Sequence, residues 1–210
     1  MHHGQICFST ERIIVLESVA DEFIELLKQK AAEYISSNAA TVNLAQKAHG
    51  YLVDAERKGA KYIFGKAEFL SDISLAPALL TGVTKEMSIW DEETFGPSAS
   101  VFVVDNDNEA VVLANDSVYG LNAAVHTGNM QRALNVGNRL EVGQVHVNAL
   151  TENDERKSCA RATPAPSRAR DYIPLVAVSP IAYWVLVLPF YCLILSLTLP
   201  HHSNVPPWRY

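Results

Sequence analysis

The sequence predicts an α/β fold over residues 1–155, with an open sheet of mostly parallel strands and flanking helices. Short runs of apolar, often β-branched residues alternate with longer segments whose apolar residues recur at helical spacing. The strand runs are almost continuously apolar, which is typical of strands covered by helices on both faces. After Glu155 this alternation stops, and a tail of different character follows.

The composition supports a folded core and limits the classes of partner. Of the 210 residues, 49% are hydrophobic and 19% are charged, which is enough apolar content for one domain. The formal net charge is -6, and the first 150 residues contain no dense basic patch. Nucleic acid is therefore excluded as the main partner.

The cysteines and histidines predict no structural metal and no disulfide framework. Cys7, Cys159 and Cys192 are widely spaced, which fits a reducing compartment. The adjacent histidines near each end of the chain have no further ligands around them. The first residues lack a charged-then-apolar signal sequence, so we expect a cytoplasmic location.

The first half of residues 1–155 predicts three strands and two helices. A β-branched run is followed by an amphipathic segment, and a second amphipathic segment ends at Gly59. In chain order the predicted elements are strand 13–16, helix 18–34, helix 42–58, strand 61–64 and strand 78–83.

The second half shows the same alternation of predicted strands and helices. Asp105 or Asn106 is expected to cap a short helix, because both side chains can accept hydrogen bonds from a helix N-terminus. The predicted elements are strand 99–104, helix 109–115, strand 121–126, helix 129–140 and strand 143–147. In helix 129–140 the residues expected to face inward are Met130, Ala133, Leu134 and Val136.

The tail divides into three segments. Residues 156–171 are basic and aperiodic, and they predict a disordered linker. Residues 172–200 are apolar and uncharged, long enough to span a bilayer, with the globular part then on the cytoplasmic side. Residues 201–210 form a short end segment. A second interpretation is that the tail comes from an altered reading frame or a retained intron.

Cys7 is the candidate catalytic residue. It lies in a short polar segment before an apolar run, with Gly4 and Gln5 before it and Arg12 after it. A cysteine is a nucleophile only as the thiolate, which needs partial exposure and a positive or helix-N-terminal environment. The alternative is that Cys7 is a small buried hydrophobic residue, as free cysteines often are.

A second motif extends from Trp90 to Pro97 and contains an acidic pair, an aromatic residue and a Gly-Pro turn. In front of a buried strand, this motif would hold the Glu93 carboxylate and the Phe95 ring at an edge of the sheet, where open α/β proteins commonly bind ligands. The alternative is a solvated acidic turn with Phe95 in the core.

Four motifs together resemble the aldehyde dehydrogenase superfamily, and most of all its salicylaldehyde or vanillin dehydrogenase type. They occur in family order between Gly4 and about Glu155. The motifs are Gly4-Gln5-Ile6-Cys7, Glu92-Glu93-Thr94-Phe95-Gly96-Pro97, the segment from Leu113 to Val125, and Gly143-Gln144-Val145-His146-Val147-Asn148.

The resemblance implies oxidation of an aldehyde to a carboxylic acid with NAD or NADP. Cys7 would attack the aldehyde carbon to give a thiohemiacetal, and its backbone N–H would contribute to the oxyanion hole. Glu93 matches the residue that binds the nicotinamide ribose hydroxyls, and Phe95 matches the aromatic residue beside the nicotinamide. An aromatic aldehyde is the implied substrate.

The departures from the family lead to further expectations. In the family the dinucleotide-binding segment, the oxyanion-hole asparagine and the general base precede the nucleophile, whereas three residues precede Gly4 here. We therefore expect this chain to be inactive alone. Homo-oligomers are implied by the family, but the tail replaces the strand that forms their interface. The alternative function is a non-catalytic, tail-anchored or partner-binding protein that reuses the α/β fold.

Overall fold

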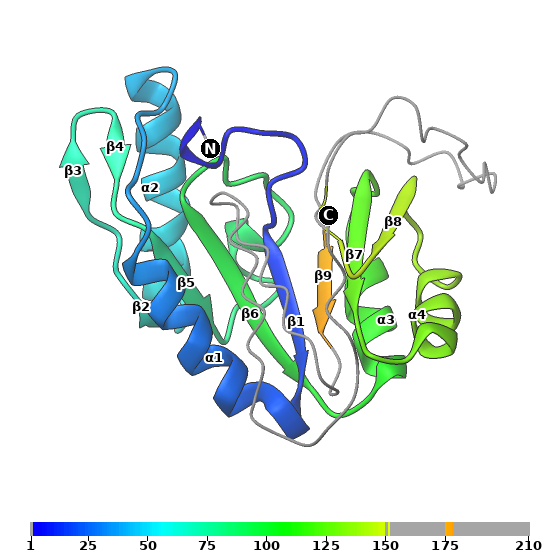
Figure 1. Cartoon of the computed structure of the whole chain (residues 1–210). Helices are drawn as coiled ribbons and strands as arrows, with labels where there is room; N and C mark the ends of the chain where they lie inside the picture. Colours follow the sequence, from blue (N-terminus) through cyan, green and yellow to red (C-terminus); the bar gives the residue numbers. More distant parts are fainter. Residues whose placement is uncertain (1, 150, 152–174, 179–210) are drawn as a thin grey trace, which may run out of the picture.

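A computed structural model describes residues 2–149, 151 and 175–178. Within these residues one seven-stranded sheet has the strand order β2-β5-β6-β1-β9-β7-β8 (Figure 1). Its strands are β1 (Arg12–Leu16), β2 (Lys61–Phe64), β5 (Ala78–Thr81), β6 (Ser98–Val104), β7 (Asn122–His126), β8 (Gln144–Val147) and β9 (Leu175–Val178). All neighbouring strands are parallel except β2, which pairs antiparallel with β5 at one edge. The predicted fold class is confirmed.

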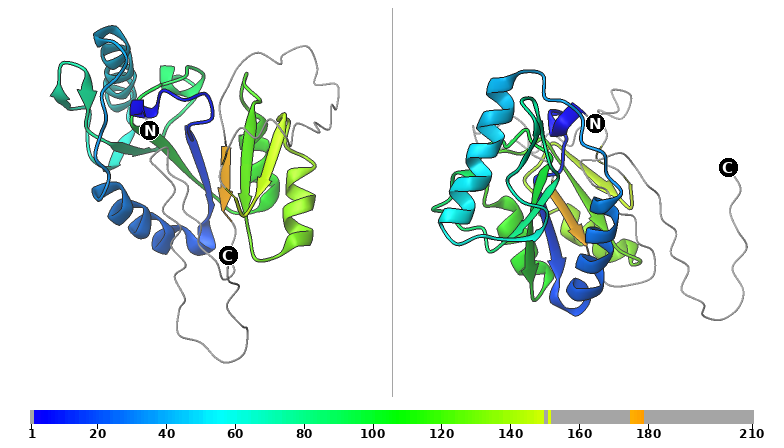
Figure 2. Two further views of the ribbon diagram at one scale, coloured as in Figure 1. Left: turned by 45° about the horizontal axis from the view of Figure 1, so that its top comes forward. Right: turned by 90° about the vertical axis from the view of Figure 1, so that its left-hand side faces the viewer.

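Four α-helices flank the sheet within the described residues: α1 (Glu17–Ala32), α2 (Val42–Arg57), α3 (Asp107–Asn115) and α4 (Met130–Gly137). Three of them begin at side-chain caps, because Thr41, Asn106 and Asn129 each accept a hydrogen bond from the first turn. The right-hand view of Figure 2 shows α1 and α2 on opposite sides of the sheet.

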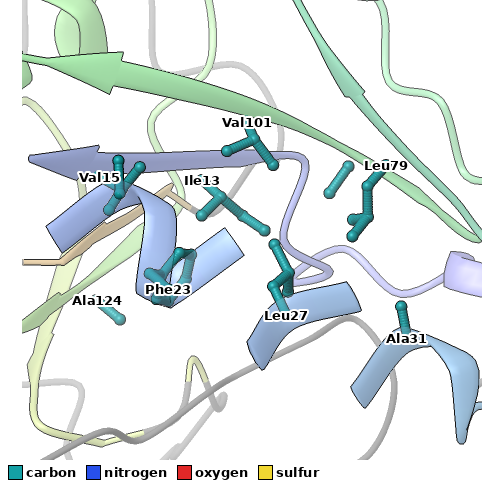
Figure 3. Close-up of a cluster of buried hydrophobic side chains, with 10 residues drawn as sticks. Ile13, Val15, Phe23, Leu27, Ala31, Leu79, Val101 and Ala124 are labelled. Atoms are coloured by element: carbon teal, nitrogen blue, oxygen red, sulfur yellow. The ribbon is translucent and has the colours of Figure 1, made fainter. Parts of the chain in front are cut away.

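Strand β1 is the centre of the core because both of its faces are covered. Ile13 and Val15 pack with Phe23 and Leu27 of α1 in one hydrophobic cluster (Figure 3). Ile14 lies in a second cluster, on the α3 and α4 side of the sheet. Alternate residues of a strand point to opposite faces, so the continuous apolar run is the consequence of two covered faces.

The structure corrects the helix predicted over 129–140. The helix α4 ends at Gly137, and only Ala133 and Val136 of the four expected inward residues are buried. Met130 is 58% exposed and Leu134 is 49% exposed. The structure also contains a small hairpin of β3 (Phe69–Ser71) and β4 (Ser74–Leu75), and a 3₁₀ turn η2 (Ser88–Trp90), which the sequence analysis did not predict.

The described part of the tail is a strand of the main sheet. Strand β9 lies between β1 and β7 and pairs in parallel with both. It falls within the apolar segment 172–200, whose other residues lie outside the described part of the chain, as do the predicted linker 156–171 and the end segment 201–210. Among the residues that the structure describes, no helix is long and apolar enough to cross a membrane.

Candidate active site

The Cys7 loop, residues 3–11, leads into the amino end of β1. Cys7 is partly exposed, and a tight turn around it is closed by the Ser9 N–H, which donates to the Ile6 carbonyl oxygen at 2.8 Å. The alternative of a fully buried thiol is therefore not what the fold produces. Thr151 returns to this loop from beyond β8 and donates its hydroxyl to the Phe8 carbonyl oxygen at 3.1 Å.

Side chains near the start of the Cys7 loop fix it to the segment between α1 and α2. The His3 backbone N–H donates to Ser37 Oγ at 2.6 Å, and Nδ1 of the His3 ring lies 2.8 Å from the Ser37 carbonyl oxygen. Gln5 Oε1 accepts from the Ala40 N–H at 2.8 Å. Burial lowers the pKa of His3, because the charged imidazolium loses its hydration there. The loop that carries Cys7 is thus anchored on both sides of the thiol.

The Glu93 loop, residues 91–97, leads into the amino end of the neighbouring strand β6. The two loops pack backbone against backbone, since a Cβ on Gly4 would lie only 2.1 Å from the Gly96 carbonyl oxygen. Gly4 has a φ of +77°, which a glycine adopts without strain. The structure therefore brings together the segments that carry the three predicted site residues.

Glu93 and Phe95 are both partly exposed in this loop. Phe95 has a φ of +46°, a left-handed conformation that is strained for a bulky residue. Tyr119, from the loop between α3 and β7, lies close to both acidic residues. Burial raises the pKa of Tyr119, and the negative charges of Glu93 and Glu92 raise it further. The alternative of a Phe95 in the core does not hold.

Arg12 connects the start of β1 to the segment before the Glu93 loop and to the motif that begins at Leu113. Its guanidinium donates to the Trp90 carbonyl oxygen at 2.6 Å, the Leu113 carbonyl oxygen at 3.2 Å and the Asp116 carbonyl oxygen at 2.8 Å. It also lies 4.5 Å from the centroid of the Trp90 ring. Arg12 is 4% exposed. These contacts give Arg12 a structural role, rather than that of the positive neighbour of Cys7.

Glu11 is a site residue that the sequence analysis missed. Its Oε1 lies 3.4 Å from the Phe95 nitrogen, which donates to it. Loss of hydration raises the pKa of Glu11 to about 7, against the opposing effect of the polar groups of Thr94 and Phe95. The only sequence signal was its place next to Arg12, four residues after Cys7.

The position of the site differs from the one expected for open α/β proteins. Both loops precede strands, so the site lies at the amino ends of β1 and β6 and not at the carboxyl ends. His126, at the carboxyl end of β7, is buried as expected for a core histidine, and burial lowers its pKa to about 4. Among the described residues no cluster of ligating side chains could hold a metal ion.

The sheet, its flanking helices and the paired loops define an α/β domain of the kind found in solved aldehyde dehydrogenases. The chain belongs to the aldehyde dehydrogenase family, whose family model matches residues 1–160. The resemblance seen in the four motifs is thereby confirmed.

Individual relatives support the same assignment. The chain is 39% identical over 170 residues to salicylaldehyde dehydrogenase from Pseudomonas putida, covering 75% of this chain and 35% of that protein. It is 38% identical over 164 residues to vanillin dehydrogenase from a Pseudomonas strain, covering 73% of this chain and 34% of that protein. The chain therefore spans about a third of the length of the curated relatives it matches.

Solved structures match the fold with similar coverage. NADP-dependent glyceraldehyde-3-phosphate dehydrogenase from Bacillus halodurans, complexed with NADP, superposes with a TM-score of 0.68 and 34% identity, over 73% of this chain and 34% of that chain. Succinic semialdehyde dehydrogenase from Streptococcus pyogenes, with NADP+ as the cofactor, superposes with a TM-score of 0.68 and 26% identity, over 72% of this chain and 36% of that chain.

Proposed function

We propose that the chain is the catalytic portion of an NAD(P)+-dependent dehydrogenase that oxidises an aromatic aldehyde, with Cys7 as its nucleophile. The observation that carries the proposal is the backbone contact between Gly4 and Gly96, which holds the Cys7 loop against the Glu93 loop. The aromatic substrate is supported by the likeness to the salicylaldehyde and vanillin dehydrogenases.

Cys7 supplies the covalent chemistry. Its thiolate attacks the carbonyl carbon of the aldehyde, and the carbonyl electron pair moves to oxygen to give a thiohemiacetal alkoxide. The Cys7 backbone N–H is the donor proposed for this developing oxyanion. After oxidation Cys7 carries the acyl group as a thioester, until water releases the carboxylic acid. Partial exposure of Cys7 gives both the aldehyde and water access to the sulfur.

Glu93 and Phe95 fit the nicotinamide end of the cofactor. The Glu93 carboxylate is partly exposed in a loop and can accept two hydrogen bonds from a ribose diol. Phe95 is partly exposed in the same loop, which suits a contact between its ring and a planar heterocycle. When bound, NAD+ or NADP+ supplies the hydride acceptor. The residues present therefore fit this part of the cofactor.

Competition for the Cys7 thiol tests the proposal without requiring turnover. The chain would carry Cys159→Ser and Cys192→Ser, so that iodoacetamide reports on Cys7 alone. We expect benzaldehyde to slow Cys7 alkylation in a saturable manner, and more strongly than acetaldehyde does, because the thiohemiacetal removes the free thiolate. A Cys7→Ser variant of this background is the matched blank. Equal, non-saturable effects of the two aldehydes would contradict an aromatic site.

A further inference from the structure

Glu11 bridges the two loops of the site through both its backbone and its side chain. It is the last residue of the Cys7 loop, and its carbonyl oxygen accepts from the Ser100 N–H of β6 at 2.8 Å. Its carboxyl group turns the other way, towards the Glu93 loop, and accepts from the Phe95 N–H at 3.4 Å. One residue thus connects β1, β6 and the Glu93 loop.

The acceptor is placed at the strained point of the Glu93 loop. A bulky residue with a φ of +46° persists only where its surroundings fix it. Two neighbours fix Phe95. Glu11 accepts its N–H. The following residue, Gly96, is closely packed, because a Cβ on it would lie 2.8 Å from the Ala48 Cβ. The Glu11 carboxyl group is the only one of these constraints that can change its charge.

We propose that Glu11 is a positioning residue of the dehydrogenase site: its carboxyl group holds the Thr94–Phe95 turn and so sets Glu93 and Phe95 beside the Cys7 loop. This inference rests on the proposed function for the roles of the positioned groups. The contact itself is independent of that function.

Two charged groups act on Glu11. Glu93, in the loop it holds, has the same sign of charge and opposes ionisation of Glu11. Arg12, its neighbour in β1, has the opposite sign, although its donors bind Trp90, Leu113 and Asp116. Desolvation is the largest effect and raises the pKa of Glu11 from 4.5 to about 7. We call the contact between the Glu11 carboxyl group and the Phe95 N–H the junction. Opening of the junction would hydrate the carboxyl group, so the closed junction binds the proton more tightly than the open one. The closed junction therefore weakens as the pH rises from 4.5 to 7.

Hydrogen exchange of the Phe95 amide measures this junction directly. In the wild-type chain we expect its protection factor to fall by about tenfold or more between pH 5 and pH 8. Glu11→Gln, which is neutral at every pH, gives a flat profile, whereas Glu11→Asp keeps the slope because it keeps the carboxyl group. Glu92→Gln is the control. It also removes one negative charge near the junction but leaves the acceptor of the Phe95 N–H in place, so we expect the wild-type profile.

Two results would overturn the inference: a flat wild-type profile, or a Glu11→Gln profile with the wild-type slope. The wild-type profile alone decides the first, even if a variant folds poorly. The aldehyde competition at Cys7 separates this inference from the proposed function. Loss of competition with an intact Glu11-dependent profile would refute the function only, and the reverse would refute only the role of Glu11.

Discussion

Gly4 and Gly96 lie in direct backbone contact, so close that a Cβ on Gly4 would come within 2.1 Å of the Gly96 carbonyl oxygen. The two glycines are 92 positions apart in sequence and belong to the loops that lead into neighbouring parallel strands. This contact makes the Cys7 loop and the Glu93 loop one structural unit, and the proposed chemistry depends on it.

Gly4→Ala should destabilise the fold and separate the loops. The new methyl group meets backbone atoms, and the φ of +77° is unfavourable for alanine, so we expect a loss of about 2–4 kcal/mol. Urea unfolding measures the change. Gly50→Ala is the matched control, because no atom beyond the adjoining helix backbone lies within 4 Å of its Cβ position and the residue is inside α2. That control should gain about 0.5–1 kcal/mol. Equal effects of the two substitutions would argue against the contact.

Arg12→Met should cost about 2–4 kcal/mol, because one buried and two partly buried carbonyl oxygens lose their donor while the apolar stem is kept. Thermal and urea unfolding at constant pH give the value. Arg57→Met is the comparison, since Arg57 is 76% exposed and pairs only with a carboxylate on the surface of α2. We expect that variant to unfold like the wild type. A small effect at Arg12 would show that the segments around Trp90 and Leu113 do not depend on its guanidinium group.

His126→Phe should remove a pH-dependent loss of stability. The unfolded chain protonates this histidine near pH 6.5, whereas burial lowers its pKa in the fold to about 4. The unfolded state therefore binds more protons between these values, and stability falls as the pH drops from 6.5 towards 4, by up to about 3 kcal/mol. Unfolding free energies at pH 5 and pH 8 measure the slope. His126→Phe should lose less stability on acidification than the wild type.

Glu11→Gln should change the same pH profile in the opposite direction. The pKa of Glu11 is raised in the fold, so its proton stabilises the folded state, and that contribution is lost as the pH rises from 4.5 through about 7. The glutamine variant should therefore lose more stability on acidification than the wild type does. Parallel profiles for the wild type and both variants would mean that neither group is perturbed by the fold.

Strand β9 should exchange its amide hydrogens together with the centre of the sheet. It pairs on both sides, with β1 and with β7, so its amides become accessible only when the sheet opens. Hydrogen exchange with mass spectrometry of the full chain resolves this segment. If residues 175–178 exchanged as fast as a free peptide, β9 would not be a strand of the sheet in solution.

The strands could be predicted well from the sequence, because burial on both faces leaves a continuous apolar run such as Ile13 to Leu16. Helix α4 was predicted too long at its C-terminal end, since it stops at Gly137. The sequence also does not show that Met130 and Leu134 lie on its exposed side. The hairpin β3–β4 was missed since its strands are short and Phe69 and Leu70 are exposed. Strand β9 was not predicted, because nothing in its sequence distinguishes it from the rest of the apolar segment. Its position depends on pairing with β1 and β7.

The site residues that lie within the sequence motifs could be predicted, and those outside the motifs could not. Cys7, Glu93 and Phe95 were found because their neighbours form recognisable patterns, and their roles stay predictions. Glu11 was missed because an ionisable residue beside an arginine usually indicates solvent exposure, and only the tertiary contact with Phe95 shows otherwise. Homo-oligomer formation and inactivity of the isolated chain also stay predictions.

Acylation of Cys7 by an activated aromatic ester tests the central claim most directly, because it needs no hydride acceptor. In the Cys159→Ser/Cys192→Ser background, p-nitrophenyl benzoate would transfer its benzoyl group to the Cys7 sulfur and release p-nitrophenolate. We predict a rapid burst of about one equivalent of nitrophenolate per chain, absent from Cys7→Ser, with the benzoyl group located on Cys7 by mass spectrometry. A reaction no faster than that of a free cysteine peptide would contradict the assignment of Cys7 as an activated nucleophile.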